Sequence, residues 1–222
     1  MTIITLTQFK GGVGKTTSAV CLSTLLCERG ETLLIDSDLN RSASLWARKG
    51  KLPFTVCDDR EAPKLLSKGK YEYIIIDTPA RPASDEIESL AKGCDLIIIP
   101  TSPDPLSLAA LAQIAKVLPE GTNYRCLLTM VPPKPQKDGA EAFEALERNG
   151  FPTFKRTIRR YKAYVKATDL GLSLNKVPGG GIAWSDWTTL WEELKDYVWK
   201  QIRWHFQCGI QVKCQGWANP KK

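Results

Sequence analysis

Residues 3–17 read Ile3-Ile4-Thr5-Leu6-Thr7-Gln8-Phe9-Lys10-Gly11-Gly12-Val13-Gly14-Lys15-Thr16-Thr17, an apolar, strand-like run that leads into a glycine-rich turn. A glycine-rich turn between a strand and a helix lets backbone N–H groups converge on phosphate oxygens, aided by the positive end of the helix dipole. The sequence therefore predicts a phosphate-binding loop formed by Gly11, Gly12, Val13, Gly14, Lys15, Thr16 and Thr17.

Two side chains of this loop have predicted roles. Lys15 supplies positive charge for the β- and γ-phosphates of a nucleotide, and the hydroxyl of Thr16 is placed to ligate Mg²⁺. The alternative is a glycine-rich turn with an incidental lysine. That alternative does not explain why the strand, the turn, the Gly-Lys-Thr triplet and a helix-like segment follow one another.

Short apolar runs recur along the chain, at residues 3–7, 32–35, 73–76, 96–99 and 126–129. They are continuous rather than alternating, as expected for strands buried on both faces of a parallel sheet. Segments 17–29 and 106–117 have apolar residues at three- and four-residue spacing, which indicates crossover helices. We therefore expect an α/β fold with a doubly wound, mostly parallel sheet, helices on both faces and ligands at the carboxyl ends of the strands.

The 222 residues, 43% of them hydrophobic, suit one compact domain, expected over residues 1–205. Residues 206–222 lack periodicity, and we expect a poorly ordered tail there. Ser185 is the expected N-cap of a last helix. One face of that helix would be apolar, with Trp187, Leu190, Trp191, Leu194, Val198 and Ile202.

Seven cysteines without C-x-x-C spacing favour neither a disulfide framework nor a zinc site. The chain shows no cleavable leader and no apolar run of 18 residues, so we expect a cytoplasmic protein.

Three aspartates follow predicted strands. Asp36 and Asp38 come after the second apolar run, and Asp77 comes after the third. Because the carboxyl ends of parallel strands meet at the edge where the phosphate loop lies, we expect the three acids to converge on one Mg²⁺. Asp77 would hold the ion through a water, since Mg²⁺ keeps several of its own waters. Isolated aspartates at strand ends more often form caps or turns, but this spacing after a phosphate loop favours the metal role.

The loop departs from the ordinary G-x-x-x-x-G-K-[ST] pattern, because Phe9 stands where glycine is required and a second lysine, Lys10, follows it. The version found here, K-G-G-x-G-K-T-T, resembles the deviant Walker A loop of the ParA/MinD superfamily. The resemblance implies a P-loop ATPase with weak intrinsic turnover, with ATP and Mg²⁺ as its cofactors. It also implies a homodimer, a nucleotide sandwich in which Lys10 reaches the phosphates bound by the other subunit.

The same resemblance assigns further roles. Asp36 would support the metal shell with Thr16 and Asp77, and Asp38 would orient the attacking water. The predicted catalytic groups are then Lys10, Lys15 and Asp38. Partition ATPases usually continue the aspartate pair with Pro-Gln, whereas this chain has Leu39-Asn40. The segment 100–106 resembles the family's proline-rich interface segment, and a rigid strand-to-helix connection is the alternative.

The net charge of +7 is unevenly distributed. Residues 1–150 carry 18 basic and 19 acidic residues, whereas residues 151–222 carry 13 basic and 5 acidic ones. Such asymmetry suits a surface that meets a polyanion. In the family, basic residues of the C-terminal region bind DNA without sequence preference, which carries over to Arg156, Arg159, Arg160, Lys162 and Lys166. The alternative is that some of them line the nucleotide pocket or pair with Asp169.

The resemblance to small, single-domain ParA proteins extends over most of the first 175 residues. It implies association with the nucleoid and an adaptor protein, either ParB-like or like a carboxysome adaptor, that stimulates hydrolysis. The loop begins within ten residues of Met1, so we expect no N-terminal helix-turn-helix extension. The cargo stays open between plasmid, chromosome, carboxysome and other assemblies.

Other members of the superfamily are alternatives. A MinD-like membrane-associated switch is the main one, because four aromatic residues lie among basic residues near the C-terminus: Tyr197, Trp199, Trp204 and Phe206. Packing of a terminal helix on the sheet is the commoner use of such a pattern, so no membrane contact is expected. A relative of nitrogenase iron protein would need a cysteine in a glycine-flanked loop, and neither Cys94 nor Cys126 lies in one. A tyrosine-kinase relative would need a tyrosine-rich tail, which this chain lacks.

Overall fold

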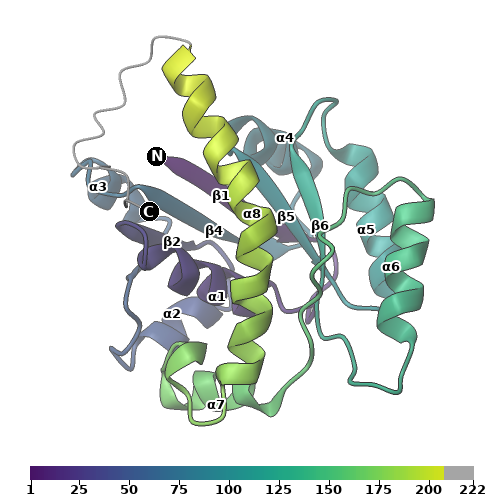
Figure 1. Cartoon of the computed structure of the whole chain (residues 1–222). Coiled ribbons are helices and arrows are strands. Elements are labelled where there is room, and N and C mark those ends of the chain that lie inside the picture. The colour runs from purple at the N-terminus through teal and green to yellow at the C-terminus, as the bar shows by residue number, and fades with distance from the viewer. Residues whose placement is uncertain (208–222) are drawn as a thin grey trace, which may run out of the picture.

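The computed structural model describes the backbone of residues 1–207 and the side chains up to Val198, Ser84 excepted. Six strands form a parallel sheet in the order β3-β2-β4-β1-β5-β6 (Figure 1). The strands are β1 (Thr2–Gln8), β2 (Thr32–Asp36), β3 (Thr55–Asp58), β4 (Tyr73–Ala80), β5 (Leu96–Thr101) and β6 (Tyr124–Leu128). The prediction of a doubly wound α/β fold is confirmed.

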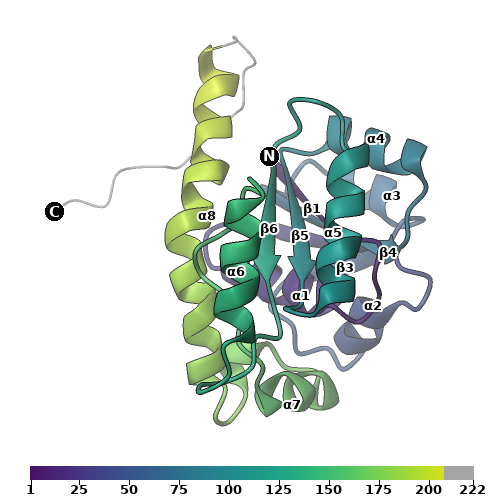
Figure 2. The same ribbon diagram turned by 90° about the vertical axis from the view of Figure 1, so that its right-hand side faces the viewer.

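Helices cover both faces of the sheet (Figures 1 and 2). One hydrophobic cluster joins α1 (Lys15–Cys27), α7 (Lys162–Leu170) and α8 (Gly181–Gln207) to one face through residues such as Leu6, Ile75 and Ile98. A second cluster joins α4 (Ser84–Gly93), α5 (Pro105–Val117) and α6 (Asp138–Arg148) to the other face through Ile97 and Ile99. Alternate residues of one apolar run thus pack in opposite directions, which is why the runs are continuous.

Shorter helices complete the layers: α2 (Ser42–Ala47), α3 (Ala62–Leu66) and the 3₁₀ helix η1 (Leu174–Lys176). Strand β3 is absent from the sequence-based prediction. It has only four residues, it lies at an edge of the sheet, and only Cys57 of them is buried. Its apolar signal is therefore too short to stand out from a loop.

The last helix begins earlier than expected. The amide of Trp184 donates to the carbonyl of Gly180 at 2.8 Å, and the hydroxyl of Ser185 donates to the carbonyl of Ile182 at 2.7 Å. Ser185 thus lies inside α8, and its assignment as the N-cap was wrong. The chain can turn into the helix at Gly180 because glycine has no Cβ. In any other residue the Cβ would lie 2.3 Å from the carbonyl oxygen of Leu174.

The expected apolar face of α8 packs on the sheet. Trp187, Leu190, Leu194 and Val198 are buried and Trp191 is partly buried, whereas the side chain of Ile202 lies outside the described residues. The predicted tail also lies outside them from residue 208 onward. Within residues 1–207, none of the helices is both long enough and apolar enough to cross a membrane.

Candidate nucleotide site

The predicted phosphate loop connects the end of β1 to the start of α1. Gly12 and Gly14 have φ of +77° and +81°, values that side chains with a Cβ rarely adopt. Gly14 stands at the N-cap position, and the first N–H groups of a helix have no acceptor within the helix. The hydroxyl of Thr129, just after β6, donates to the carbonyl of Val13 at 2.7 Å and fixes the loop from the side. The loop thus presents amide donors at the carboxyl edge of the sheet.

Lys15 is nearly buried, with 7% of its surface exposed. Its Nζ lies 3.7 Å from Oδ2 of Asp38, which is also buried. Asp38 accepts a second contact from the amide of Asn40 at 2.8 Å, which closes a tight turn after β2. Leu39 lies in this turn with 89% of its surface exposed, where partition ATPases have proline. The structure therefore places Asp38, which follows β2, beside Lys15 of the phosphate loop.

Asp36 and Asp77 lie opposite each other on β2 and β4, and both are fully buried. Oδ2 of Asp36 accepts from the amide and the hydroxyl of Ser44 at 2.8 and 2.7 Å. Among the described residues, neither oxygen of Asp77 has a hydrogen-bond partner, and Oδ1 of Asp36 has none either. Buried carboxylate oxygens rarely stay without a partner, so these atoms are poised for a ligand.

Burial raises the pKa of Asp77 to about 6, and the negative charges of Asp36 and Asp38 act in the same direction. The nearby hydroxyl of Thr16, which does not reach hydrogen-bonding geometry with either oxygen, and the ammonium of Lys15 lower the pKa, but desolvation is the larger effect. A divalent cation would reverse this balance, because it stabilises the ionised carboxylate.

The donor set fits Mg²⁺, which prefers hard oxygen ligands and retains water. The orphaned oxygens of Asp77 and Asp36 and the nearby hydroxyl of Thr16 are such ligands. Across the part of the chain that the structure describes, no three His, Cys, Asp or Glu side chains form a metal cage of their own. The rest of the coordination shell would therefore come from phosphate oxygens and water.

Lys10, the lysine that the deviant loop adds, contacts a different acid. Its Nζ donates to Oδ1 of Asp104 at 2.7 Å and to the hydroxyl of Ser107 at 2.9 Å. Asp104 is also the N-cap of α5, where it accepts from the amide of Ser107 at 3.0 Å and from the hydroxyls of Ser102 and Ser107 at 2.6 Å. Partial burial acts to raise the pKa of Asp104, but these hydrogen bonds hold it well below the usual range. Sequence reasoning missed this acceptor for Lys10, although an aspartate followed by proline, here Asp104-Pro105, is typical of a helix start.

Residues 4–179 match the family described as the CobQ/CobB/MinD/ParA nucleotide binding domain. The chain belongs to this family. A 36% identical relative from Gloeobacter kilaueensis, named maintenance of carboxysome distribution protein A, aligns over 90% of this chain and 96% of its own length. A ParA protein from Rhizobium radiobacter is 26% identical over 80% of this chain and 86% of its own length.

Solved structures show the same fold. An ATP complex of McdA from Cyanothece superposes with a TM-score of 0.68 at 18% identity, covering 88% of this chain and 96% of that one. MinD from Aquifex aeolicus superposes with a TM-score of 0.63 at 18% identity, over 86% and 97% of the two chains. The resemblance to the ParA/MinD family inferred from the loop is thus confirmed, and the family consists of P-loop ATPases.

Beside the phosphate loop of this ParA/MinD-family protein lies a pocket of about 410 Å³. Its lining comes from the loop, the segment 102–104 and the start of α6: Lys10, Gly11, Gly12, Ser102, Pro103, Asp104, Met130, Pro132, Asp138 and Arg160. Arg160, one of the five predicted DNA-binding residues, therefore lies next to the nucleotide loop. This is the alternative placement that the sequence left open.

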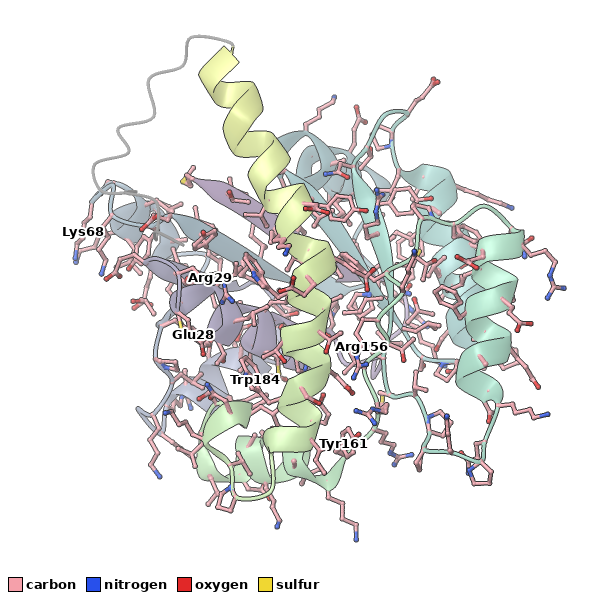
Figure 3. The ribbon with its side chains drawn as sticks, viewed as in Figure 1. Glu28, Arg29, Lys68, Arg156, Tyr161 and Trp184 are labelled. Carbon is pink, nitrogen blue, oxygen red and sulfur yellow. The ribbon has the colours of Figure 1, made fainter. Side chains whose placement is uncertain are left out.

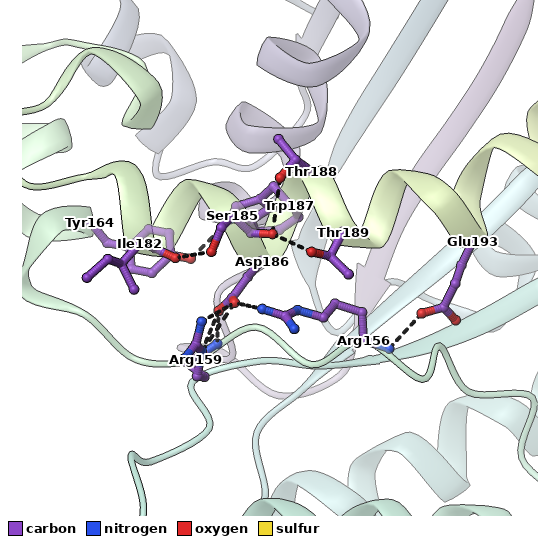
Figure 4. Close-up of polar contacts among 10 residues, drawn as sticks. All are labelled: Arg156, Arg159, Tyr164, Ile182, Ser185, Asp186, Trp187, Thr188, Thr189 and Glu193. Atoms are coloured by element: carbon purple, nitrogen blue, oxygen red, sulfur yellow. Dashed lines mark hydrogen bonds and ion pairs between the residues drawn. The ribbon is translucent and has the colours of Figure 1, made fainter.

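Two more of those five residues are held by a buried acid on α8 (Figure 4). Asp186 is fully buried and accepts from Nη2 and Nε of Arg159 at 2.6 and 3.1 Å, and it pairs with Nη2 of Arg156 as well. The carboxylate of Glu193 accepts from the amides of Lys155 and Arg156 at 2.8 and 2.7 Å. Pairing with an acid was one of the alternatives that the sequence left open, but the acid is Asp186 and not Asp169. The sequence did carry a signal for this contact, because Asp186 and Glu193 lie seven residues apart and therefore on one face of α8.

The remaining two candidates, Lys162 and Lys166, are exposed on α7. Figure 3 shows Arg156 and Tyr161 beside α8, on the segment that leads into α7. The structure therefore divides the five predicted DNA-binding residues among a buried ion-pair cluster, the rim of the pocket and an exposed helix.

On the other side of α8, the guanidinium of Arg29 lies 4.1 Å from the centre of the Trp191 ring.

Proposed function

We propose that this protein is a ParA-like ATPase that acts as a dimerisation switch. It binds ATP and Mg²⁺, pairs face to face with a second copy, holds DNA without sequence preference and releases it after slow, adaptor-stimulated hydrolysis. The observation that carries the proposal is the deviant loop, in which Lys10 adds a second cation to a complete phosphate-binding turn. The family match over residues 4–179 supports the ATPase part.

Each residue has a role in this proposal. The loop amides and Lys15 bind the phosphates. Thr16, Asp36 and Asp77 would hold Mg²⁺, which would supply positive charge next to the transferred group. Asp38 exchanges its contact with Lys15 for the attacking water and orients it in line with the γ-phosphate. Lys10 leaves Asp104 and contacts the phosphates bound by the partner subunit, where it acts like an arginine finger.

Two cargo classes are consistent with the relatives. The 36% identical relative is named for carboxysome distribution, which favours positioning of a carboxysome-type assembly over the nucleoid, with a carboxysome-adaptor-like protein as partner. A more distant relative is named ParA, which supports plasmid or chromosome partition with a ParB-like adaptor as the second candidate.

Binding of the full chain to a random-sequence DNA duplex tests the proposal. Fluorescence anisotropy should show tight binding with ATP and Mg²⁺, weak binding with ADP, and a strong decrease with salt. Size-exclusion chromatography with light scattering should show a dimer only with ATP. Equal binding in all nucleotide states would contradict the switch. Binding to anionic vesicles instead of DNA would favour a MinD-like membrane ATPase.

A further inference from the structure

A second basic segment lies in the half of the sequence that is nearly neutral overall. Residues 39–57 contain no aspartate or glutamate and four basic residues: Arg41, Arg48, Lys49 and Lys51. Three of these, Arg48, Lys49 and Lys51, follow α2 directly and are exposed. We call them the α2 basic turn.

The α2 basic turn is joined to the carboxyl end of α7. Nζ of Lys49 donates to the carbonyls of Asp169 and Thr168, the latter at 3.4 Å, and Nζ of Lys51 donates to the carbonyl of Leu170 at 3.3 Å. The indole of Trp46 donates to the carbonyl of Leu172 at 3.0 Å. The backbone of Lys51 also bridges to Leu172 in a parallel sense. Two segments about 120 residues apart thus form one surface.

The close approach depends on Gly171. This residue ends α7 with φ of +66°, and a Cβ on it would lie 2.3 Å from Cβ of Lys49. The last carbonyls of a helix carry negative partial charge, which explains why two ammonium groups gather there. A neutral carbonyl orders an ammonium group without cancelling its charge. The two lysines therefore remain available to a polyanion.

The joined surface is strongly basic. Lys162 and Lys166 are exposed on α7, and Asp169 is the acidic residue of that helix. A nine-residue helix is about 13 Å long. Cations near both of its ends can therefore meet several phosphates of a duplex, which follow one another on each strand with a rise of about 3.4 Å along the helix axis. Figures 1 and 2 both show α2 next to α7, beyond the carboxyl ends of the strands.

We propose that Arg48, Lys49 and Lys51 form, with Lys162 and Lys166, one phosphate-binding surface for double-stranded DNA. This inference rests on the proposed function, because it assumes that the ATP-bound protein binds DNA. It assigns DNA contacts to the N-terminal half of the chain. Arg156 and Arg159 contribute less charge to such a surface, because the buried carboxylate of Asp186 pairs with both.

Matched alanine variants test this surface in the full chain. Arg48→Ala and the double variant Arg48→Ala/Lys51→Ala are compared with Arg60→Ala and Arg60→Ala/Lys64→Ala, which remove exposed charges next to and within α3. Binding of the ATP-bound protein to a random-sequence duplex is measured at several salt concentrations. Each test substitution should lower the magnitude of the slope of log K against log salt by about 0.9, and the double variant should bind on the order of 10- to 100-fold more weakly near 0.1 M salt. The α3 variants should match the unaltered protein.

Lys51→Arg guards against a folding artefact, because it keeps the charge at this position and should therefore keep the slope of the unaltered protein. ATP-dependent dimerisation and DNA-free ATP hydrolysis should be unchanged in every variant. If the double variant keeps the original slope and affinity, the surface is wrongly assigned while the proposed function stands. A loss of dimerisation in these variants would make the α2 basic turn a subunit interface and overturn the inference. Weaker binding of the variants to phosphatidylglycerol vesicles, with DNA binding intact, would overturn it as well, because the surface would then bind lipid. If the unaltered protein shows no ATP-dependent DNA binding, the proposed function itself fails.

Discussion

The two lysines of one loop occupy opposite kinds of environment. Lys15 is 7% exposed and lies among three buried acids, one of which has no hydrogen-bond partner on either oxygen among the described residues. The side chain of Lys10 is 34% exposed and has two good acceptors, Asp104 and Ser107. We call Lys15 with its three acids the inner half of the site, and Lys10 with Asp104 and Ser107 the outer half. The inner half thus contains carboxylate oxygens without hydrogen-bond partners among the described residues, whereas the lysine of the outer half has its acceptors within one subunit. In the proposed mechanism, ligand would complete the acids around Lys15 directly, whereas Lys10 would first have to leave Asp104 and Ser107.

Lys10→Ala should have the largest effect, because it should remove ATP hydrolysis without removing ATP binding. The variant should still bind ATP, because Lys15 and the loop amides remain, but hydrolysis should fall by about 10³- to 10⁵-fold, the range seen for cations that stabilise phosphoryl transfer in trans. Phosphate release and ATP binding by calorimetry measure the two effects. Lys15→Ala is the comparison variant and should lose ATP binding itself. Normal hydrolysis by Lys10→Ala would refute the nucleotide-sandwich argument.

Asp38→Ala tests the inner half alone. Turnover should fall by about 10²- to 10⁴-fold, the usual contribution of a positioned proton-accepting group, while the ATP-bound dimer persists. Light scattering with ATP and a phosphate-release assay make the comparison. Asp59→Ala, which removes a more exposed acid from the same edge of the sheet, is the control. Loss of ATP binding by Asp38→Ala would show that this residue binds nucleotide and does not orient water.

Asp77→Asn should stabilise the nucleotide-free protein. The pKa of Asp77 is raised from 3.8 to about 6, so its contribution to stability is present below pH 3.8 and is lost as the pH rises through about 6. The ionised carboxylate then costs up to about 3 kcal/mol near neutral pH, at 1.36 kcal/mol per pKa unit. Thermal unfolding at pH 5 and pH 7.5 should show a larger gain at pH 7.5.

The same variant should lose the stabilisation that ATP and Mg²⁺ give the original protein. Glu120→Gln, at an exposed position, is the control and should change neither quantity. A gain that is equal at both pH values would mean that the charge of Asp77 is not the cause.

How much of this structure can be predicted from the sequence depends on how far apart along the chain the interacting residues lie. The phosphate loop and the long strands are local patterns, and both were predicted. The four residues of β3 were missed because an edge strand this short carries too little apolar signal. The contact between Lys10 and Asp104 spans 94 positions, and it exists because β1 and β5 are neighbours in the sheet. The pairing of Asp186 with Arg156 and Arg159 likewise depends on how α8 crosses the sheet, which no local pattern states.

Asp104→Asn should give the smallest effect and tests the outer half directly. Asparagine still caps α5, so the helix should remain in place, but the charge that holds Lys10 is gone. The two side chains are 34% and 42% exposed, and ion pairs in such positions contribute about 1 kcal/mol or less. The ATP concentration for half-maximal dimerisation should therefore fall about two- to fivefold.

Glu88→Gln, which removes the exposed Lys92–Glu88 pair on α4, is the matched control and should leave this ATP concentration unchanged. Because hydrogen bonds hold the pKa of Asp104 far below neutrality, the difference should be the same at pH 6 and pH 8. An unchanged or higher ATP requirement would mean that Lys10 is not restrained by Asp104 before the subunits meet.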